Sequence, residues 1–306
     1  MYFGVTMDRY AKFLDRLQAG ACLLIDGGTG TECERRGIPQ LDNAWNGGGA
    51  LSHPDIVRTI HSDYLNAGAE IIISNTFATT LHALRDAGED ERFDDYNRQG
   101  VVLACEARDA SDRPEALVAG GISYWSWTHE LPTLQDLANS VERQARIMAQ
   151  AGADLVMLEM MIDIDRMLTT LKAAQTAGLP VWVGVSCAPN DSGVMALWNG
   201  EPLEDALKAL NGQNVPLVSI MHTDTAYVDE CLEIVNAHWS RLVGVYAHSG
   251  KKSQEGEWLF HDTIEPARFT AHCQRWRDQG AAIIGGCCGI RPEHIVDLSE
   301  HLQSEG

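Results

Sequence analysis

Short apolar segments recur along the chain, and each is separated from the next by a stretch whose apolar positions have helical spacing. Eight such segments can be recognised, and they are rich in valine, isoleucine and leucine without strict alternation of apolar and polar positions. This pattern is typical of parallel strands that are buried on both faces of a sheet. The predicted strands cover residues 22–26, 70–74, 116–120, 154–159, 181–186, 216–221, 242–247 and 281–286.

Residues 8–17 carry apolar side chains at helical spacing and predict a helix ahead of the first strand. Eight β–α units in 306 residues predict an α/β fold, and they favour a single closed (β/α)8 TIM barrel with an N-terminal helical lead-in. No linker or low-complexity stretch divides the sequence, so we expect one barrel domain over residues 1–306. The irregular segments 32–46 and 125–132 are expected to cover the mouth of the barrel.

Composition and charge exclude several classes of protein. The net charge is −20 and no basic stripe is present, which argues against a nucleic-acid partner. No apolar run is long enough to cross a bilayer and the N-terminus lacks the features of a signal peptide, so we expect no membrane partner. Eight cysteines without a paired spacing motif indicate free thiols and a cytoplasmic localisation. We expect a monomer or a small homo-oligomer.

Polar and metal-binding residue types follow the predicted strands. In a (β/α)8 barrel the reactive side chains lie at the carboxyl ends of the strands, which form one rim. The sequence therefore predicts a single polar site at this rim. The residues that end or follow the eight strands, in order, are Asp26; Asn75 and Thr76; Gly120 and Gly121; Glu159; Cys187; His222; His248; and Cys287 with Cys288.

Two adjacent cysteines, Cys287 and Cys288, follow the last strand and are flanked by glycines. Neighbouring cysteines rarely form a disulfide with each other, because the small ring strains its geometry. Two thiolates suit one soft metal ion, usually zinc. The alternative is a pair of buried core cysteines.

Several of these segments resemble signature motifs of the homocysteine S-methyltransferase family. The resemblance rests on residues 26–32, 74–77, 155–159, 246–250 and 285–289, and it extends over nearly the whole chain. It implies a (β/α)8 barrel that binds zinc through cysteines and transfers a methyl group to the sulfur of homocysteine, giving methionine. The family has a third cysteine ligand after the sixth strand, where this chain has His222. An imidazole is also a good zinc ligand, and the alternative is a histidine that is hydrogen-bonded in a polar rim.

The resemblance also implies roles for individual residues. His222, Cys287 and Cys288 are the expected zinc ligands and the catalytic group. Glu159 is expected to hold the α-amino group of the substrate, and Asp26 could share this role or cap the following helix. Backbone N–H groups near Gly27 and Thr76 are expected to bind the substrate carboxylate.

The methyl donor is expected to be a cationic onium compound, S-methylmethionine or another sulfonium. Aromatic faces bind such cations, and Trp45, Phe77, Tyr124, Trp125 and Trp127 all fall in the predicted mouth loops. Two other functions stay open: a metal-dependent hydrolase or lyase that activates water, and a methyltransferase that has diverged to another thiol. A barrel that has lost catalysis and only binds its ligand is a third possibility.

Overall fold

A closed barrel of parallel strands forms the centre of the protein. A computed structural model describes residues 2–252, 258–259 and 263–303. Eight strands are hydrogen-bonded in the order β1-β12-β9-β8-β5-β4-β3-β2, and a parallel bridge between Ile25 and Ile71 joins the two ends of this order. The predicted (β/α)8 barrel is therefore confirmed. The strands are β1 (Leu23–Leu24), β2 (Ile71–Ile73), β3 (Leu117–Ile122), β4 (Leu155–Met161), β5 (Val181–Val185), β8 (Leu217–Asp224), β9 (Leu242–His248) and β12 (Ile283–Gly286).

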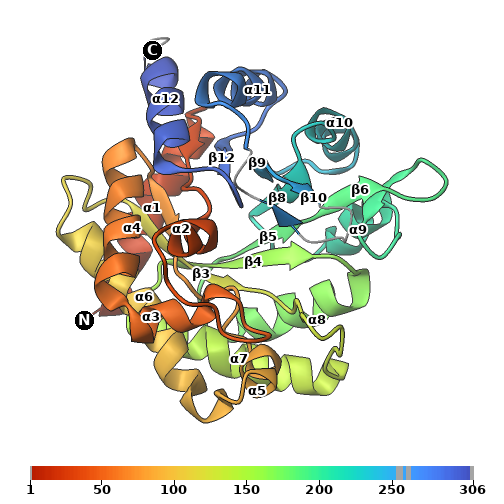
Figure 1. The fold of residues 1–306 in the computed structure, drawn as a ribbon. Coiled ribbons are helices and arrows are strands. Elements are labelled where there is room, and N and C mark those ends of the chain that lie inside the picture. The colour runs from red at the N-terminus through yellow and green to blue at the C-terminus, as the bar shows by residue number, and fades with distance from the viewer. Residues whose placement is uncertain (1, 253–257, 260–262, 304–306) are drawn as a thin grey trace.

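Helices surround the strands (Figure 1). An apolar layer of side chains fills the space between the helices and the strands. This layer explains the continuous apolar runs in the sequence, because each strand is covered on its outer face as well as inside the barrel. No helix in the described part of the chain is long and apolar enough to cross a membrane. The surrounding helices are α2 (Thr29–Arg35), α4 (Pro54–Ala67), α6 (Phe93–Asp109), α7 (Leu134–Ala151), α8 (Ile164–Gln175), α9 (Leu203–Leu210), α10 (Val228–His238), α11 (Pro266–Asp278) and α12 (Pro292–Gln303).

Shorter elements decorate the loops. In the described part of the chain, β6 pairs with β7 and β10 pairs with β11, each pair as a two-stranded antiparallel sheet. These strands are β6 (Cys187–Pro189), β7 (Met195–Leu197), β10 (Lys251–Lys252) and β11 (Trp258–Leu259). The remaining elements are the short helices α3 (Gly49–Ser52) and α5 (Leu81–Asp86) and the 3₁₀ turns Asn46–Gly48 and Asp90–Arg92.

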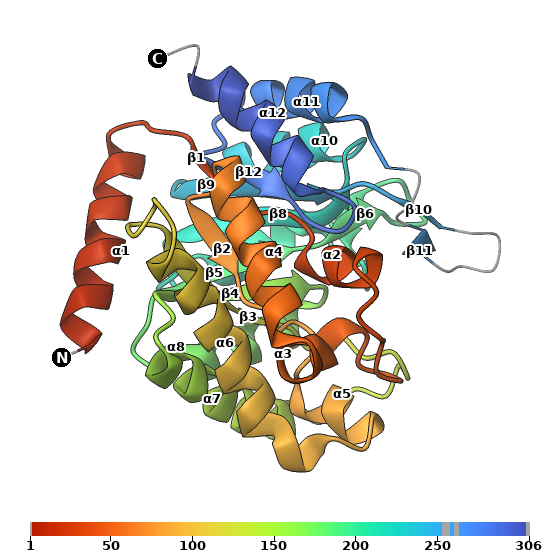
Figure 2. The same ribbon diagram turned by 60° about the vertical axis from the view of Figure 1, so that its left-hand side comes forward.

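Helix α1 (Tyr2–Gln18) covers the N-terminal end of the barrel, on the side away from β10 and β11 (Figure 2). Its buried side chains Tyr10, Phe13 and Leu17 belong to the same apolar cluster as the interior of the barrel. The Trp182 indole N–H donates a hydrogen bond of 3.0 Å to the Tyr10 hydroxyl. The helix therefore closes one end of the barrel and leaves the other end for a ligand.

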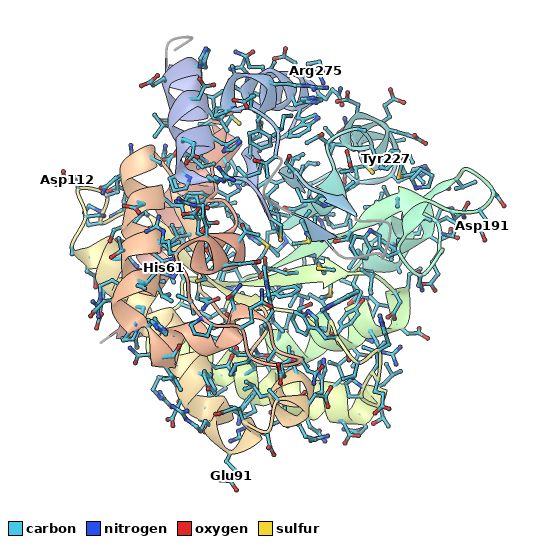
Figure 3. The ribbon with its side chains drawn as sticks, viewed as in Figure 1. His61, Glu91, Asp112, Asp191, Tyr227 and Arg275 are labelled. Carbon is cyan, nitrogen blue, oxygen red and sulfur yellow. The ribbon has the colours of Figure 1, made fainter. Side chains whose placement is uncertain are left out.

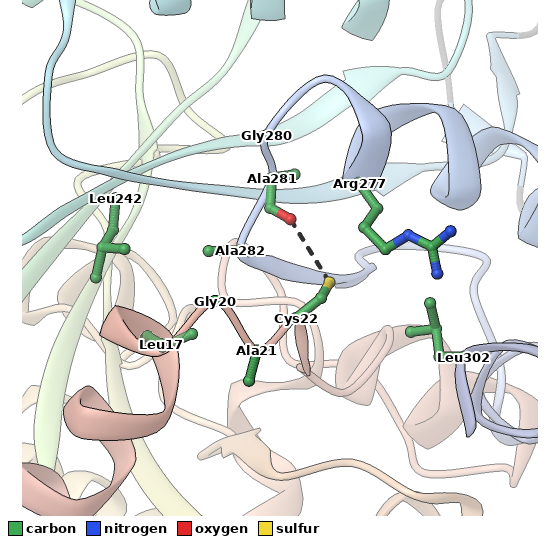
Figure 4. A pocket seen from close by; sticks show the side chains of 10 residues that line it. All are labelled: Leu17, Gly20, Ala21, Cys22, Leu242, Arg277, Gly280, Ala281, Ala282 and Leu302. Carbon is green, nitrogen blue, oxygen red and sulfur yellow. Dashed lines mark hydrogen bonds between the residues drawn. The ribbon is translucent and has the colours of Figure 1, made fainter. Parts of the chain in front are cut away.

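A cavity of about 570 Å³ lies at this closed end, between the end of α1 and the start of β12 (Figure 4). The Cys22 thiol donates a hydrogen bond of 3.5 Å to the carbonyl oxygen of Ala281 and so links the starts of β1 and β12. Burial raises the pKa of Cys22 to about 11, which keeps the thiol neutral.

The His61 side chain of α4 is fully buried (Figure 3). Neither ring nitrogen has a hydrogen-bond partner among the described residues. Burial lowers the pKa of His61 from 6.5 to about 4, because the imidazolium would lose its hydration without gaining a partner. This histidine is therefore a neutral part of the helix layer.

His61 predicts a pH dependence of stability. The unfolded imidazole takes up a proton as the pH falls through 6.5, whereas the folded one stays neutral until about pH 4, so stability is lost over this window. We expect His61→Leu to reduce the change in unfolding free energy between pH 7 and pH 5 by about 2 kcal/mol. Urea unfolding at both pH values measures this, and an unchanged pH dependence would contradict a neutral, unpartnered imidazole.

Candidate metal and substrate site

A cavity of about 650 Å³ opens at the carboxyl ends of the strands. Its wall contains residues from both predicted mouth segments as well as from the strand ends, which agrees with the expected position of the site. The predicted site residues that line it are Gly27, Glu159, His222, Cys287 and Cys288. Other lining residues used below are Trp45, Asn75, Phe77, Trp125, Trp127, Trp198 and Tyr246.

The cysteine pair is held in place by backbone hydrogen bonds to β9 and its extension. The Cys287 N–H donates to the carbonyl oxygen of Ala247 at 2.8 Å, and the Cys288 carbonyl accepts from the N–H of Ser249 at 2.9 Å. These bonds continue the pairing of β12 with β9 beyond the last residue of the strand. The two sulfurs therefore project from a fixed backbone.

Two glycines make this turn possible. Gly289 has φ +79°, a conformation that glycine adopts far more readily than other residues, and it ends the turn after the cysteine pair. A Cβ atom at Gly28 would lie 2.8 Å from the carbonyl oxygen of Cys287 and 3.1 Å from the Cα of Cys288. The first β–α loop can therefore pack against the cysteine loop only because this position lacks a side chain.

A β-bulge at the end of β8 sets the direction of His222. Met221 faces Tyr246 of β9 and Asp224 faces His248, so three steps along β8 match two along β9. His222 lies inside this bulge with φ +41°, which is an unfavourable backbone conformation for histidine. The imidazole consequently lines the cavity.

A second bulge interrupts β4 at the same rim. Leu158 and Met161 of β4 face Val183 and Val185 of β5, so β4 also carries one extra residue. Met160 within it has φ +53°. Glu159 lies in this bulge and lines the cavity. Bulges of this kind often re-aim side chains beside active sites.

His222, Cys287 and Cys288 form a compact group of metal-binding atoms. The Cys287 Sγ atom lies 3.5 Å from His222 Nδ1 and 3.9 Å from Cys288 Sγ. All three ligand atoms lie within 4.8 Å of one another. Around a tetrahedral zinc ion, Zn–S and Zn–N bonds of about 2.3 and 2.0 Å place two sulfurs about 3.8 Å apart and sulfur and nitrogen about 3.5 Å apart. The three side chains therefore fit such an ion.

The electrostatics of the cysteine pair favour a bound cation. The neighbouring Cys288 thiol and burial raise the pKa of Cys287 well above its usual value. Without a cation the Cys287 thiol therefore stays protonated at neutral pH. A metal ion reverses this, because a coordinated thiol loses its proton.

Glu159 is a buried carboxyl group without a cationic partner. Its side chain is 6% exposed, and no arginine, lysine or histidine of the described residues forms an ion pair with it. Burial raises the pKa of Glu159 to about 8. A buried carboxyl group with a raised pKa in the wall of a cavity is a candidate for binding a cationic group of a ligand.

Asp26 and Thr76 lie behind the cavity wall. The Asp26 carboxyl group accepts a hydrogen bond of 2.8 Å from the N–H of Ile73 and so joins β1 to β2. Burial raises the pKa of Asp26 well above its usual value. The alternative role as a helix cap is not seen, since the N-cap of α2 is Gly28 and no side chain caps it. The Thr76 N–H donates to the Ser74 carbonyl at 2.7 Å, so it is already used within the loop.

Two further residues that the sequence placed at the mouth lie elsewhere. Cys187 is fully buried in the layer between helices and strands, beside the thiol of Cys231. Tyr124 is also fully buried there, and its hydroxyl accepts hydrogen bonds of 2.6 and 2.9 Å from the N–H groups of Ile162 and Asp163. Neither residue lines the cavity, because the strand ends carry them outward.

Aromatic rings form a wall of the cavity. Phe77 packs edge-on against Trp127 with ring centroids 6.2 Å apart, and Trp125 packs against Trp198 at 6.0 Å. Trp198 was not among the residues expected from the sequence. It follows the β6–β7 hairpin, which the strand pattern did not reveal, although a tryptophan in a turn rich in polar residues was an available signal.

A family model for homocysteine S-methyltransferase matches residues 23–302 of the chain. The chain belongs to this family. The match covers the barrel strands and the metal-binding group, and it confirms the resemblance seen in the sequence motifs.

Individual relatives within the family are distant but match over nearly their full length. Homocysteine S-methyltransferase 1 of Zea mays is 28% identical, over 94% of this chain and 96% of its own length. The selenocysteine Se-methyltransferase of Brassica oleracea var. italica is 27% identical, over 94% and 90%. The metallated crystal form of the Escherichia coli homocysteine methyltransferase MmuM has a TM-score of 0.76 at 24% identity, covering 92% of this chain and 96% of its own.

The ligand group of this family member predicts a metal content that depends on the cysteine pair. We expect the purified, reduced protein to bind one divalent metal ion per chain and Cys287→Ser to lose most of it, because the group then offers one thiolate fewer. Elemental analysis after gel filtration measures the metal. Cys22→Ser, at the opposite end of the barrel, is the matched control and should keep its metal. Equal metal content in the two variants would exclude the ligand group.

Proposed function

We propose that the protein is a zinc-dependent S-methyltransferase that moves a methyl group from a sulfonium donor, S-methylmethionine or a related compound, to the thiol of homocysteine. The product would be methionine. The observation that carries the proposal is the zinc-like spacing of one nitrogen and two sulfur atoms in the wall of a cavity that also contains an unpaired carboxyl group. The family of the chain supports the same reaction.

His222, Cys287 and Cys288 would hold the zinc ion, leaving a position for the substrate sulfur. When bound, zinc supplies the positive charge that lets a thiol of pKa near about 8.5 act as a thiolate at neutral pH. The two protein thiols require a reducing compartment, in keeping with the cytoplasm.

Glu159 is proposed to bind the α-amino group of homocysteine. The substrate ammonium would supply the cation that this buried carboxyl group lacks, and the carboxyl group would then ionise. Gly27 lines the same cavity, and no hydrogen bond from its N–H is found among the described residues, so this N–H is proposed to bind the substrate carboxylate. Asp26 and Thr76 are proposed to support this pocket from behind through Ile73 and Gly121.

The aromatic wall is proposed to bind the methyl donor. A sulfonium cation is attracted to the faces of Phe77, Trp125, Trp127 and Trp198, and the apolar wall excludes water. In the transfer, the homocysteine sulfur forms a bond to the methyl carbon while the bond from that carbon to the donor sulfur breaks. The donor leaves as a neutral thioether, so positioning of the two partners is the main task of the protein.

The acceptor has a second candidate. One relative at 27% identity is a selenocysteine Se-methyltransferase, and a selenol is a soft ligand that suits the same group of donors. Direct competition between homocysteine and selenocysteine in one assay would assign the preferred acceptor.

Methionine formation tests the proposed function directly. Zinc-loaded protein with homocysteine should produce methionine from S-methylmethionine or dimethylsulfoniopropionate faster than from betaine or S-adenosylmethionine. The first two are small sulfonium compounds that fit a cavity of about 650 Å³ lined by aromatic rings. Failure of all four donors with both acceptors would contradict the proposal.

Glu159→Gln should raise the stability of the protein and weaken the binding of homocysteine. In the natural protein, Glu159 makes the unfolding free energy fall as the pH rises from about 4.5 to about 8. The folded carboxyl group keeps a proton over this range, whereas the unfolded one releases it. We expect the amide to raise the unfolding free energy of the metal-free protein by roughly 3 kcal/mol at pH 7. The KM for homocysteine should rise roughly ten- to hundred-fold, since a charge-assisted hydrogen bond is lost.

Urea unfolding and steady-state kinetics measure the two effects of Glu159→Gln. A variant that is both less stable and unchanged in KM would show that Glu159 has a structural role only.

A further inference from the structure

The imidazole of His222 must be oriented before it can bind a metal ion. Its nitrogen lone pair lies in the plane of the ring, and two side-chain torsions set that plane, whereas a cysteine thiolate has only one. The bulge that carries His222 has a strained backbone with φ +41°, which places the residue but does not fix the ring. Other contacts must therefore determine where Nδ1 points.

Among the described residues, the rings of Trp198 and His248 pack against His222. The Trp198 ring centroid lies 5.4 Å from that of His222 at an interplanar angle of 56°, and the His248 centroid lies 4.5 Å away at 46°. Trp198 follows the hairpin after β5, and His248 ends β9. In the sheet, β5 and β9 are the two neighbours of β8, so the two rings come from elements that follow or end the strands on either side of β8.

Both rings are themselves held in place. Trp198 packs edge-on against Trp125, and its hairpin is tied to β8 by a hydrogen bond of 3.0 Å from the Cys187 N–H to the Thr223 hydroxyl. His248 is 2% exposed and pairs with Asp224 across the β8–β9 ladder. The contacts on His222 therefore come from fixed parts of the barrel.

We propose that Trp198 and His248 are positioning residues that clamp the His222 ring with Nδ1 directed at the Cys287 sulfur. This inference rests on the proposed zinc site. It means that Trp198 and His248 raise the affinity for zinc although neither residue is a zinc ligand. If either ring is removed, the imidazole can rotate more freely. Metal binding must then fix the orientation of the imidazole, and this loss of rotational freedom lowers the affinity for the metal. The clamp matters only while residue 222 is a histidine.

A double-mutant comparison tests this dependence. Trp198→Ala and His248→Asn are each made in the natural chain and in the His222→Cys background, and zinc affinity is measured by competition with a chromophoric chelator. We expect each substitution to lower zinc affinity roughly ten- to hundred-fold in the natural chain, the usual effect of losing a residue that orients a ligand. In the His222→Cys background the same substitutions should change affinity less than about threefold, since a thiolate needs no ring orientation.

Two further measurements make the test specific. Trp127→Ala is the matched control, because Trp127 lines the same cavity but packs against Phe77. The zinc affinity of this variant should equal that of the natural chain. In cobalt-substituted protein, Trp198→Phe should shift the ligand-field absorption bands, whereas Trp127→Ala should not. Trp198→Phe keeps an aromatic ring, so this readout stands even if the alanine variant is poorly folded.

The outcomes separate the clamp from the proposed function. Equal losses of zinc affinity in both backgrounds, or no loss in the natural chain, would overturn the clamp while leaving zinc binding and methyl transfer intact. If the natural chain binds no zinc, both the clamp and the proposed zinc site are wrong.

Discussion

The site depends on how the ends of β8 and β12 meet across β9. The backbone of the cysteine turn is tied to Ala247 and Ser249 of β9 and its extension, and the bulge of β8 is paired with the same strand. This framework brings His222 Nδ1 within 3.5 Å of a cysteine sulfur although the two residues are 65 positions apart in the chain. The barrel thus determines the ligand spacing, and a metal ion of suitable size can bind without a large rearrangement.

Two functional side chains share an unusual local structure. His222 and Glu159 both lie in bulges with a positive φ angle at or next to them, and both are buried in the cavity wall. A strained backbone and an unpaired carboxyl group destabilise the folded protein, so their presence at one rim indicates that they serve a ligand. An aromatic wall beside them fits an amino acid and an onium compound better than it fits water, which favours methyl transfer over a hydrolase or lyase.

All eight barrel strands could be predicted from the sequence, because apolar runs and their order along the chain determine a parallel barrel. The same pattern predicted that His222, Cys287 and Cys288 lie at one rim. The bulges could not be predicted, because one extra residue at Met160 or His222 does not change the pattern of apolar residues. Without them, the directions of neighbouring side chains could not be known, and Cys187 and Tyr124 were expected at the mouth although they point outward. Trp198 was missed because its hairpin is too short to give a strand signal. The roles of Asp26 and Thr76 depend on hydrogen bonds that only the folded loops show.

X-ray absorption at the zinc edge of the reduced, zinc-loaded protein tests the ligand group most directly. The structure predicts two sulfur neighbours at about 2.3 Å and one imidazole nitrogen at about 2.0 Å, with a light atom in the remaining position when no thiol substrate is bound. Addition of homocysteine should raise the number of sulfur neighbours from two to three. A spectrum without sulfur neighbours, or one without the imidazole contribution, would contradict a zinc site formed by His222, Cys287 and Cys288.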